Sequence, residues 1–294
     1  FAHATLATYW GDAVINKTGM SLEDAYSLKR SPKADVLAWA YECFDTAIKY
    51  LPDAMSSQMR PTKSAAYGFV ARFALFHQDW EKAATYAKNC MDMNVYQLHP
   101  DYGDLFVSSK SPELMFYFKG DNAYNGGVGY YVGNEVKAFT PRQYGAFCNT
   151  GPSFSLYCSY PCVDGLPIDE SPLYNPKDGW ANRDPRFYDT ILYPGSEIRG
   201  EMYDSFNYFE NRSATKASAN GKEYFNDHTG YGLRKFHLED QPISASVQAT
   251  PHHVWFRLAE MYLNYAECCY MTGDEGTARQ YINMVRARAG MPAV

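Results

Sequence analysis

The chain has 294 residues, a length that allows one large domain or two domains of ordinary size. It carries 27 Lys and Arg against 33 Asp and Glu, a net charge of −6, and no basic cluster, which argues against a nucleic-acid partner. The hydrophobic content of 46% excludes an intrinsically disordered chain. The sequence is therefore that of a folded protein.

Aromatic residues are the unusual part of the composition. The chain has 26 Tyr, 17 Phe and 5 Trp, which together make 16% of the residues. Aromatic rings that carry a polar group suit surfaces that contact an apolar face and a polar edge at once. Sugars and protein partners both offer such surfaces.

Three helices are predicted in the first third of the chain. Ser31 and Pro32 read as the cap and first residue of a helix that Pro52 stops. Thr62 is expected to cap a second helix and Asp79 a third, joined by a tight turn. The apolar positions of the three helices are Leu37, Tyr41, Phe44, Ile48 and Leu51; then Ala66, Phe69, Val70 and Phe73; then Ala83, Ala87 and Cys90.

Two more helices are predicted near the C-terminal end, over Trp255–Thr272 and Asp274–Ala289. Gly273 and Gly290 stand where a helix commonly ends in a left-handed residue. The two helical hairpins share a pattern, because the pair Ala71 and Ala83 is matched by Ala266 and Ala278, and Tyr86 by Tyr281. Small residues at this spacing let paired helices approach closely, as in tetratricopeptide-type repeats.

The segment between the hairpins has a different character. Residues 116–160 are rich in aromatic residues and glycine and poor in charge, which indicates irregular, loop-rich structure. Short strands are expected over Leu114–Phe118 and Arg186–Tyr193, and no large sheet is expected. The predicted architecture is mainly α, with a long irregular insert.

The seven cysteines do not define a framework of disulfides. Cys43, Cys90, Cys268 and Cys269 fall in predicted helices, where we expect them to pack as buried thiols. Cys148, Cys158 and Cys162 lie in a charge-free segment, where free thiols are favoured over a disulfide. Neither a zinc-finger spacing nor a calcium-binding EF-hand occurs, so no metal or other cofactor is predicted.

Four segments resemble the SusD/RagB family of bacterial outer-membrane nutrient-binding lipoproteins. They are Arg60–Ala66 running into Asp79–Ala83; Asp164–Ile168 with Asn182–Phe187 and Ile191–Gly195; Phe256–Glu267; and Val285–Pro292. Their order and spacing agree with the family over nearly the whole chain. The family pattern extends beyond both ends of this sequence, so residues 1–294 are expected to be a single SusD-like domain that is incomplete at both ends.

The resemblance implies a non-catalytic binding protein with a tetratricopeptide-like fold. Residues 31–93 and 255–290 would form its helical-repeat parts, and residues 94–250 its ligand-binding insert. Such a protein holds an oligosaccharide or polysaccharide at the cell surface and delivers it to a SusC-like TonB-dependent transporter. It would reach the outer membrane only through an N-terminal lipid anchor, which this sequence does not contain.

Glycan binding needs flat aromatic platforms with polar groups beside them. The insert supplies both, together with glycines that let the backbone approach a ligand closely. We expect the ligand to contact Tyr124, Asn125, Tyr130, Tyr131, Arg142, Tyr144 and Trp180.

Two alternatives remain open. The helices could form a scaffold that binds only protein or peptide, through their own concave face rather than through the insert. A glycoside hydrolase would need two carboxylates flanking the scissile bond, for which Asp164, Asp169 and Glu170 are the nearest candidates. Their spacing does not define such a pair, so catalysis is the less favoured alternative.

Overall fold

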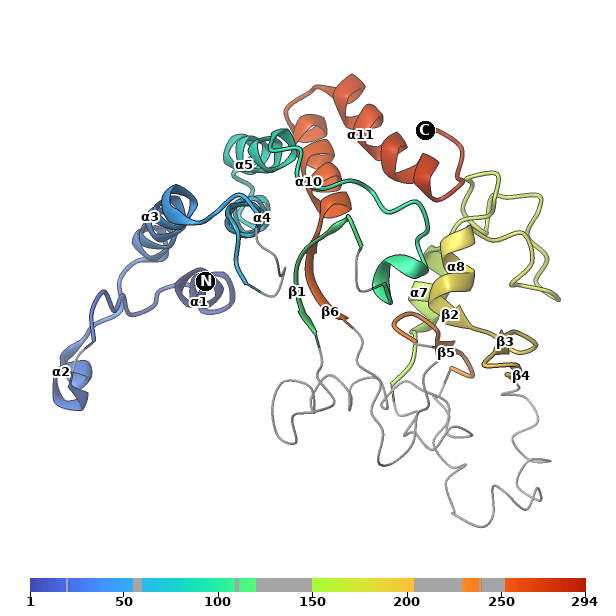
Figure 1. Cartoon of the computed structure of the whole chain (residues 1–294), viewed down its shortest axis with the longest axis horizontal. Coiled ribbons are helices and arrows are strands. Elements are labelled where there is room, and N and C mark those ends of the chain that lie inside the picture. Colours follow the sequence, from blue (N-terminus) through green and yellow to red (C-terminus); the bar gives the residue numbers. More distant parts are fainter. Residues whose placement is uncertain are drawn as a thin grey trace, which may run out of the picture. The chain divides into compact units, whose positions relative to one another are not determined.

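A computed structural model describes residues 1–19, 21–54, 60–108, 111–119, 150–203, 229–237, 239 and 252–294 (Figure 1). The chain divides into two compact units. Unit 1 comprises residues 1–97, 113–116 and 256–282, and unit 2 comprises residues 98–112, 117–255 and 283–294. The predicted mainly helical fold with a few short strands is confirmed.

Unit 1 begins with α1 (Ala2–Trp10), α2 (Leu22–Ser27) and α3 (Lys33–Tyr50). The predicted cap of α3 is wrong, because Pro32 is the N-cap and the side chain of Ser31 does not cap the helix. The Oδ1 of Asp12 instead accepts a hydrogen bond of 2.8 Å from the Lys33 N–H. Ser31 pairs through its backbone with Ala13. The predicted apolar face is confirmed, since none of its five residues is exposed.

The first predicted hairpin forms as expected. It consists of α4 (Lys63–Phe76) and α5 (Trp80–Asp92). The Thr62 hydroxyl accepts a hydrogen bond from the Ala65 N–H at 3.4 Å, and the Asp79 carboxylate accepts one from the Lys82 N–H at 3.3 Å. Both predicted caps are therefore confirmed, and Ala83, Ala87 and Cys90 on α5 are buried as predicted.

The C-terminal pair of helices is α10 (Leu258–Met271) and α11 (Glu275–Arg288). The expectation that the first of them begins at Trp255 is wrong, because Trp255–Arg257 ends the strand β6 (His252–Arg257). This strand pairs with β1 (Leu114–Lys119), the first predicted strand, which is confirmed. Gly273 and Gly290 adopt left-handed φ angles of 91° and 71°, as their positions predict.

The turns of the two hairpins have the same hydrogen bonds at equivalent positions. In the first, Gln78 donates its N–H to the Leu75 carbonyl, and Asp79 to that of Ala74. In the second, Gly273 donates to Tyr270, and Asp274 to Cys269. Gln78 has a left-handed φ of 60° where its counterpart Gly273 has 91°. The internal repeat read from the alanines and tyrosines is confirmed, and it extends through both turns.

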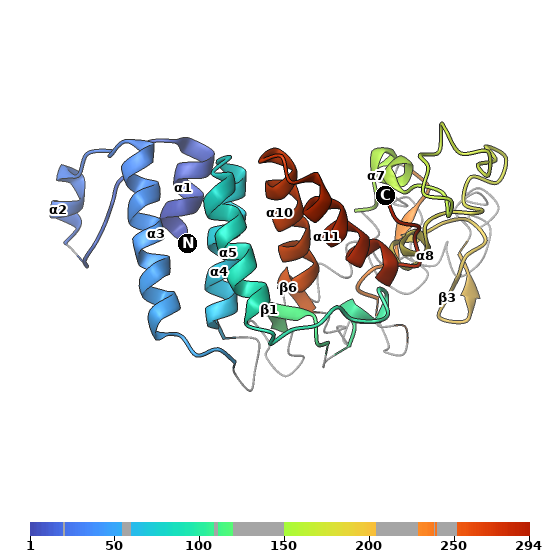
Figure 2. The same ribbon diagram turned by 90° about the horizontal axis from the view of Figure 1, so that it is seen from above.

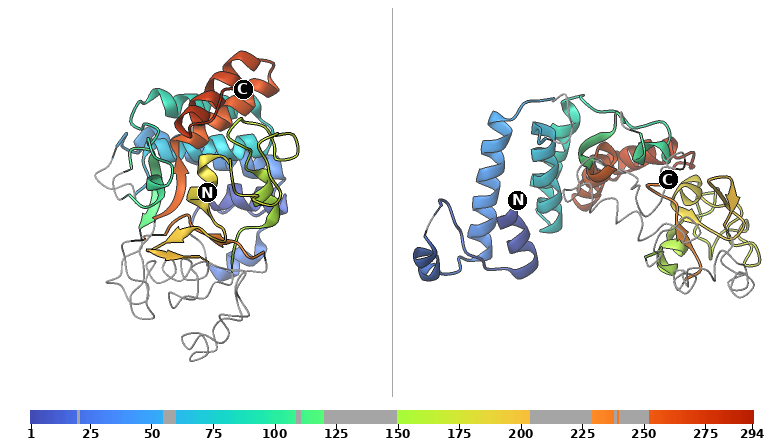
Figure 3. Two further views of the ribbon diagram at one scale, coloured as in Figure 1. Left: turned by 90° about the vertical axis from the view of Figure 1, so that its right-hand side faces the viewer. Right: turned by 60° about the horizontal axis from the view of Figure 1, so that its bottom comes forward.

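Alanines let five helices of unit 1 pack closely, and α1, α3, α4, α5 and α10 run side by side (Figures 2 and 3). One buried cluster joins α1, α3 and α4, a second joins α4, α5 and α10, and a third joins α10 to α11. The alanines of these three clusters are Ala4, Ala40, Ala74, Ala83, Ala266 and Ala278. Such layered helix pairs are typical of repeat proteins, in which each helix covers the apolar stripe of its neighbour.

Unit 2 contains short elements joined by long loops. They are the 3-10 helix η1 (Asp104–Phe106), α7 (Phe154–Ser159), α8 (Pro185–Thr190), β2 (Ile191–Leu192), β3 (Glu197–Ile198), β4 (Glu201–Met202) and β5 (Gly232–Leu233). The strand β2 pairs antiparallel with β5, and β3 with β4. The β3–β4 hairpin turns through Arg199 and Gly200, both with positive φ as a two-residue turn requires.

Two predictions in unit 2 need correction. The expected strand over Arg186–Tyr193 is mostly the helix α8, which Asp184 caps and Pro185 opens, and only Ile191 and Leu192 are extended. The charge-free segment before Val163 contains the short helix α7 as well as loop. In both cases a side-chain cap, Ser153 for α7 and Asp184 for α8, stabilises a short helix. Its effect is larger than the weak strand or loop preference of the residues that follow it.

Six of the seven cysteines lie in the described part of the chain, and all six are free thiols. Cys90, Cys268 and Cys269 are buried as predicted. The prediction is wrong for Cys43, which is exposed because Val36, Ala40 and Phe44 form the buried face of α3. Cys148 lies outside the described residues. Of the helices that the structure describes, none is both long and apolar enough to cross a membrane.

Candidate functional site

Most of the residues expected to bind a ligand lie outside the described residues. These are Tyr124, Asn125, Tyr130, Tyr131, Arg142 and Tyr144. Trp180 is described, and it is half-buried, with its ring stacked on Tyr193 at a centroid distance of 5.5 Å. The assignment of these seven residues to a ligand site remains a prediction.

Trp180 packs against an aromatic cluster that is built around one buried cation. The side chain of Arg183 is fully buried and lies against the rings of Tyr157 and Phe187, at 4.6 and 4.7 Å from their centroids. Its guanidinium donates hydrogen bonds to the carbonyls of Gly179, Tyr157 and Tyr160. The segment Asn182–Phe187 therefore has a structural role, because the side chain of Arg183 connects α7 to the loop that contains Trp180.

The carboxylates considered for catalysis do not form a catalytic pair. Asp164 accepts hydrogen bonds from the Leu166 N–H and the Ser171 hydroxyl, at 3.1 and 2.7 Å, so it stabilises its own loop. Asp169 and Glu170 are exposed. Within the part of the chain that the structure describes, no group of three or more His, Cys, Asp or Glu residues could hold a metal ion.

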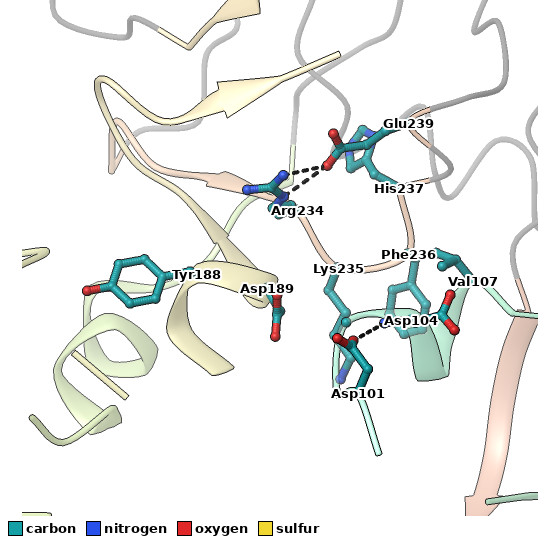
Figure 4. Close-up of a pocket in the computed structure, with 11 residues that line it drawn as sticks. Asp101, Asp104, Val107, Tyr188, Asp189, Arg234, Lys235, Phe236, His237 and Glu239 are labelled. Carbon is teal, nitrogen blue, oxygen red and sulfur yellow. Dashed lines mark hydrogen bonds and ion pairs between the residues drawn. The ribbon is translucent and has the colours of Figure 1, made fainter. Parts of the chain in front are cut away.

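The structure also contains a pocket in unit 2 that sequence patterns did not reveal. Its volume is about 480 Å³, which falls in the range of small-ligand sites. Three segments line it: the loop around η1, the end of α8, and the residues that follow β5 (Figure 4). The described lining residues are Asp101, Gly103, Asp104, Val107, Tyr188, Asp189, Arg234, Lys235, Phe236, His237 and Glu239.

The two basic residues of the pocket, Arg234 and Lys235, interact with a carboxylate and with aromatic rings, respectively. Arg234 forms an ion pair with Glu239, with a shortest N–O distance of 2.8 Å. The ammonium of Lys235 lies over the ring of Phe106, 3.9 Å from its centroid, with the rings of Phe236 and Tyr102 also near. A cation held over several rings in this way contributes to packing of the loop.

Two carboxylates face the space beside Gly103. A Cβ added to Gly103 would lie 3.0 Å from the Oδ1 of Asp189 and 3.5 Å from the Oδ1 of Asp101. Asp101 accepts a hydrogen bond of 2.7 Å from the Asp104 N–H, so its carboxylate also shapes the start of η1. Burial, with a contribution from the charge of Asp101, raises the pKa of the Asp189 carboxyl, and Arg234 opposes this effect.

His237 forms the buried inner part of the lining. Burial, together with the nearby positive charges of Arg199 and Arg234, lowers the pKa of His237 to about 4. The imidazole is therefore neutral at physiological pH. The adjacent Phe236 has a left-handed φ of 70°, an uncommon conformation for a bulky residue.

The comparisons with known proteins agree with the fold. Residues 112–294 match the model of the SusD family, and residues 1–75 match a family described as starch-binding and associating with the outer membrane. The first match covers more than half of the sequence. The chain belongs to the SusD family. Members of this family are non-catalytic binding proteins. No curated protein matches the chain.

Solved structures show the same fold. A SusD-like carbohydrate-binding protein from Bacteroides fragilis NCTC 9343 is 26% identical, with a TM-score of 0.84 over 99% of this chain and 58% of that chain. A laminarin-binding SusD-like protein is 20% identical, with a TM-score of 0.64 over 99% of this chain and 62% of that chain. A surface glycan-binding protein from Bacteroides uniformis is 19% identical, with a TM-score of 0.61 over 99% and 57%. This SusD-family chain thus spans about three-fifths of the length of these relatives.

The segments that resemble the family make specific contacts in this chain. Gly165, with a φ of 88°, leaves room for Arg286 and Pro292, because a Cβ there would meet both side chains within 3 Å. The segments around residues 165 and 286 therefore lie together in unit 2. In the segment Phe256–Glu267, Glu260 binds Arg72 through both carboxylate oxygens, and Arg257 binds the buried carboxylate of Glu113.

Proposed function

We propose that this protein captures a glycan at the cell surface without cleaving it. Membership of the SusD family over residues 112–294 carries this proposal. The structure supports it, because the helices of unit 1 form a regular scaffold, whereas unit 2 holds the aromatic cluster and the pocket. The related structures named as carbohydrate-binding and laminarin-binding proteins are further support.

The platform residues of the proposed site are those predicted from the sequence, with Tyr130 and Tyr131 at its centre. Delivery of the glycan to a SusC-like TonB-dependent transporter and attachment to the outer membrane through a lipid anchor belong to the same proposal. The match of residues 1–75 to a family associated with the outer membrane supports the location. The helices of unit 1 are the part assigned to the transporter.

Affinity electrophoresis tests the proposed capture. The chain is run through gels that contain starch, laminarin or other polysaccharides, and each glycan is incubated with the protein and analysed for released sugars. Capture predicts retardation by at least one glycan with no product. Product formation would contradict the proposal and favour the carboxylates near Asp164. A folded sample that no glycan retards would favour a protein-binding scaffold instead.

A further inference from the structure

Residues 16–30 of unit 1 form an arm that is anchored at its base. The backbones of Ala13 and Ser31 exchange hydrogen bonds of 3.2 and 2.9 Å beside the two ends of the arm. The ammonium of Lys17 lies 4.4 Å from the centroid of the Trp39 ring on α3. Every described residue of the arm is exposed, and its helix α2 stands apart from α1 and α3 (Figures 1 and 2). The arm therefore presents a helix that its own unit does not cover.

The helix α2 is short and has an apolar face. It contains six residues, and none of them is buried. Leu22 and Tyr26 are four residues apart and so lie on the same face of the helix, with exposed fractions of 73% and 83%. A helix shorter than about 12 residues is marginally stable in water unless its apolar face packs against another surface. A surface that covers Leu22 and Tyr26 would therefore stabilise α2.

The two ends of the arm helix carry opposite charges. The acidic end has Glu23 and Asp24, in the first turn of α2. The basic end has Lys29 and Arg30, which follow the helix. All four side chains are exposed, and none of them has an ion-pair partner among the described residues. The arm thus offers an apolar face between an acidic end and a basic end.

A surface with this distribution of charge is complementary to a second copy of itself. Two copies related by a two-fold axis make every contact twice, and a helix that crosses the axis packs antiparallel against its counterpart. Leu22 and Tyr26 of the two copies would then cover each other, and each acidic end would meet the basic end of the other copy. A partner of uniform charge would instead attract one end of the arm and repel the other.

We propose that two copies of this chain associate through antiparallel pairing of their α2 helices. The apolar faces form the centre of this contact, and ion pairs between acidic and basic ends form its two edges. Two helices of six residues bury less than the about 1,000 Å² of a stable interface, so the dimer is weak and forms at high protein concentration. The inference does not depend on the proposed function.

Sedimentation equilibrium of the full chain tests the proposal, at concentrations up to about 0.5 mM because the interface is small. The parent chain should form dimers. Tyr26→Ser should weaken the association at least tenfold. Tyr50→Ser is the matched control, because Tyr50 is 74% exposed on α3 outside the arm, and it should leave the association unchanged. Thermal unfolding establishes that each variant is folded.

Charge reversal distinguishes antiparallel pairing from other modes of association. Glu23→Lys with Asp24→Lys gives an arm that is basic at both ends, and Lys29→Glu with Arg30→Glu gives one that is acidic at both ends. Neither double variant should form dimers alone, whereas an equimolar mixture should form a mixed dimer. A parent chain that is monomeric at every concentration would overturn the proposal. Dimers that Tyr26→Ser leaves intact, or a mixture that stays monomeric, would overturn it as well.

Discussion

Arg183 shows how one residue organises the loops of unit 2. Its guanidinium is fully buried, and no carboxylate is paired with it in the described structure; backbone carbonyls of two separate segments accept its hydrogen bonds instead. A buried charge is tolerated only when such partners replace water. The segment Asn182–Phe187 therefore has a structural role, because its Arg183 packs against the aromatic cluster that contains Tyr157 and Phe187.

Replacing Arg183 by Met should strongly destabilise unit 2. The change leaves the carbonyls of Tyr157 and Tyr160 without the guanidinium that donates to them, whereas the Gly179 carbonyl keeps its hydrogen bond from the Tyr157 hydroxyl. Each buried unsatisfied group costs about 1–3 kcal/mol. We expect the free energy of unfolding to fall by at least about 3 kcal/mol, measured by urea denaturation. Arg279→Met is the matched control, because Arg279 forms only an exposed i,i+4 ion pair with Glu275. Equal effects of the two changes would contradict the assigned role of Arg183.

His237 should make the stability of unit 2 depend on pH. Its folded-state pKa of about 4 lies below the ordinary value of 6.5, so the unfolded chain binds the proton more readily. The stabilisation is fully present above pH 6.5 and is lost as the pH falls towards 4. Between pH 7 and pH 4.5 the loss should be about 2–3 kcal/mol.

Unfolding midpoints of the parent chain and of His237→Gln, measured across this range, check the prediction. The midpoint of the variant should fall less steeply with decreasing pH. His253→Gln serves as control, since His253 is exposed and should retain the full slope. Identical slopes in the parent chain and His237→Gln would contradict the origin assigned to the pH dependence.

At the level of elements, the two helical hairpins differ in one turn residue. Gln78 and Gly273 stand at equivalent places with left-handed backbones, yet only Gly273 adopts this conformation without cost. Gln78→Gly should therefore stabilise unit 1 by about 1 kcal/mol, and Gly273→Gln should destabilise it by a similar amount. Thermal unfolding of the two variants gives the test. No atoms crowd Gly273, so only the backbone conformation contributes there. Changes of the same sign would contradict the equivalence of the turns.

The elements that the sequence predicts correctly are those whose signals are local. Thr62 and Asp79 cap their helices because the cap and its partner lie three residues apart. The prediction fails at Ser31, where Asp12 supplies the acceptor from a distant part of the chain. It fails again over Trp255–Arg257, since only the pairing of β6 with β1 makes these residues extended. The helix α8 could have been predicted from a local signal, because Asp184 is a capping residue and Pro185 follows it at the first helical position.

At the scale of the whole molecule, family and fold are more predictable than the site. The family could be predicted from four sequence segments that resemble it. The structure shows contacts between residues of these segments, such as the close approach of Arg286 to Gly165. The pocket could not be read in the same way, because its lining comes from three segments that are far apart in the sequence. None of the three contains a recognisable binding motif.

The central claim is that the irregular insert holds the glycan, rather than the helices of unit 1. The measurement that tests it most directly is calorimetric titration with a soluble oligosaccharide of whichever glycan retards the protein in a gel. Tyr130→Ala together with Tyr131→Ala should weaken binding at least tenfold while the fold persists. Tyr270→Ala, at an exposed position on α10, should leave the affinity unchanged. Loss of binding in Tyr270→Ala, with full binding in the insert variant, would contradict the account.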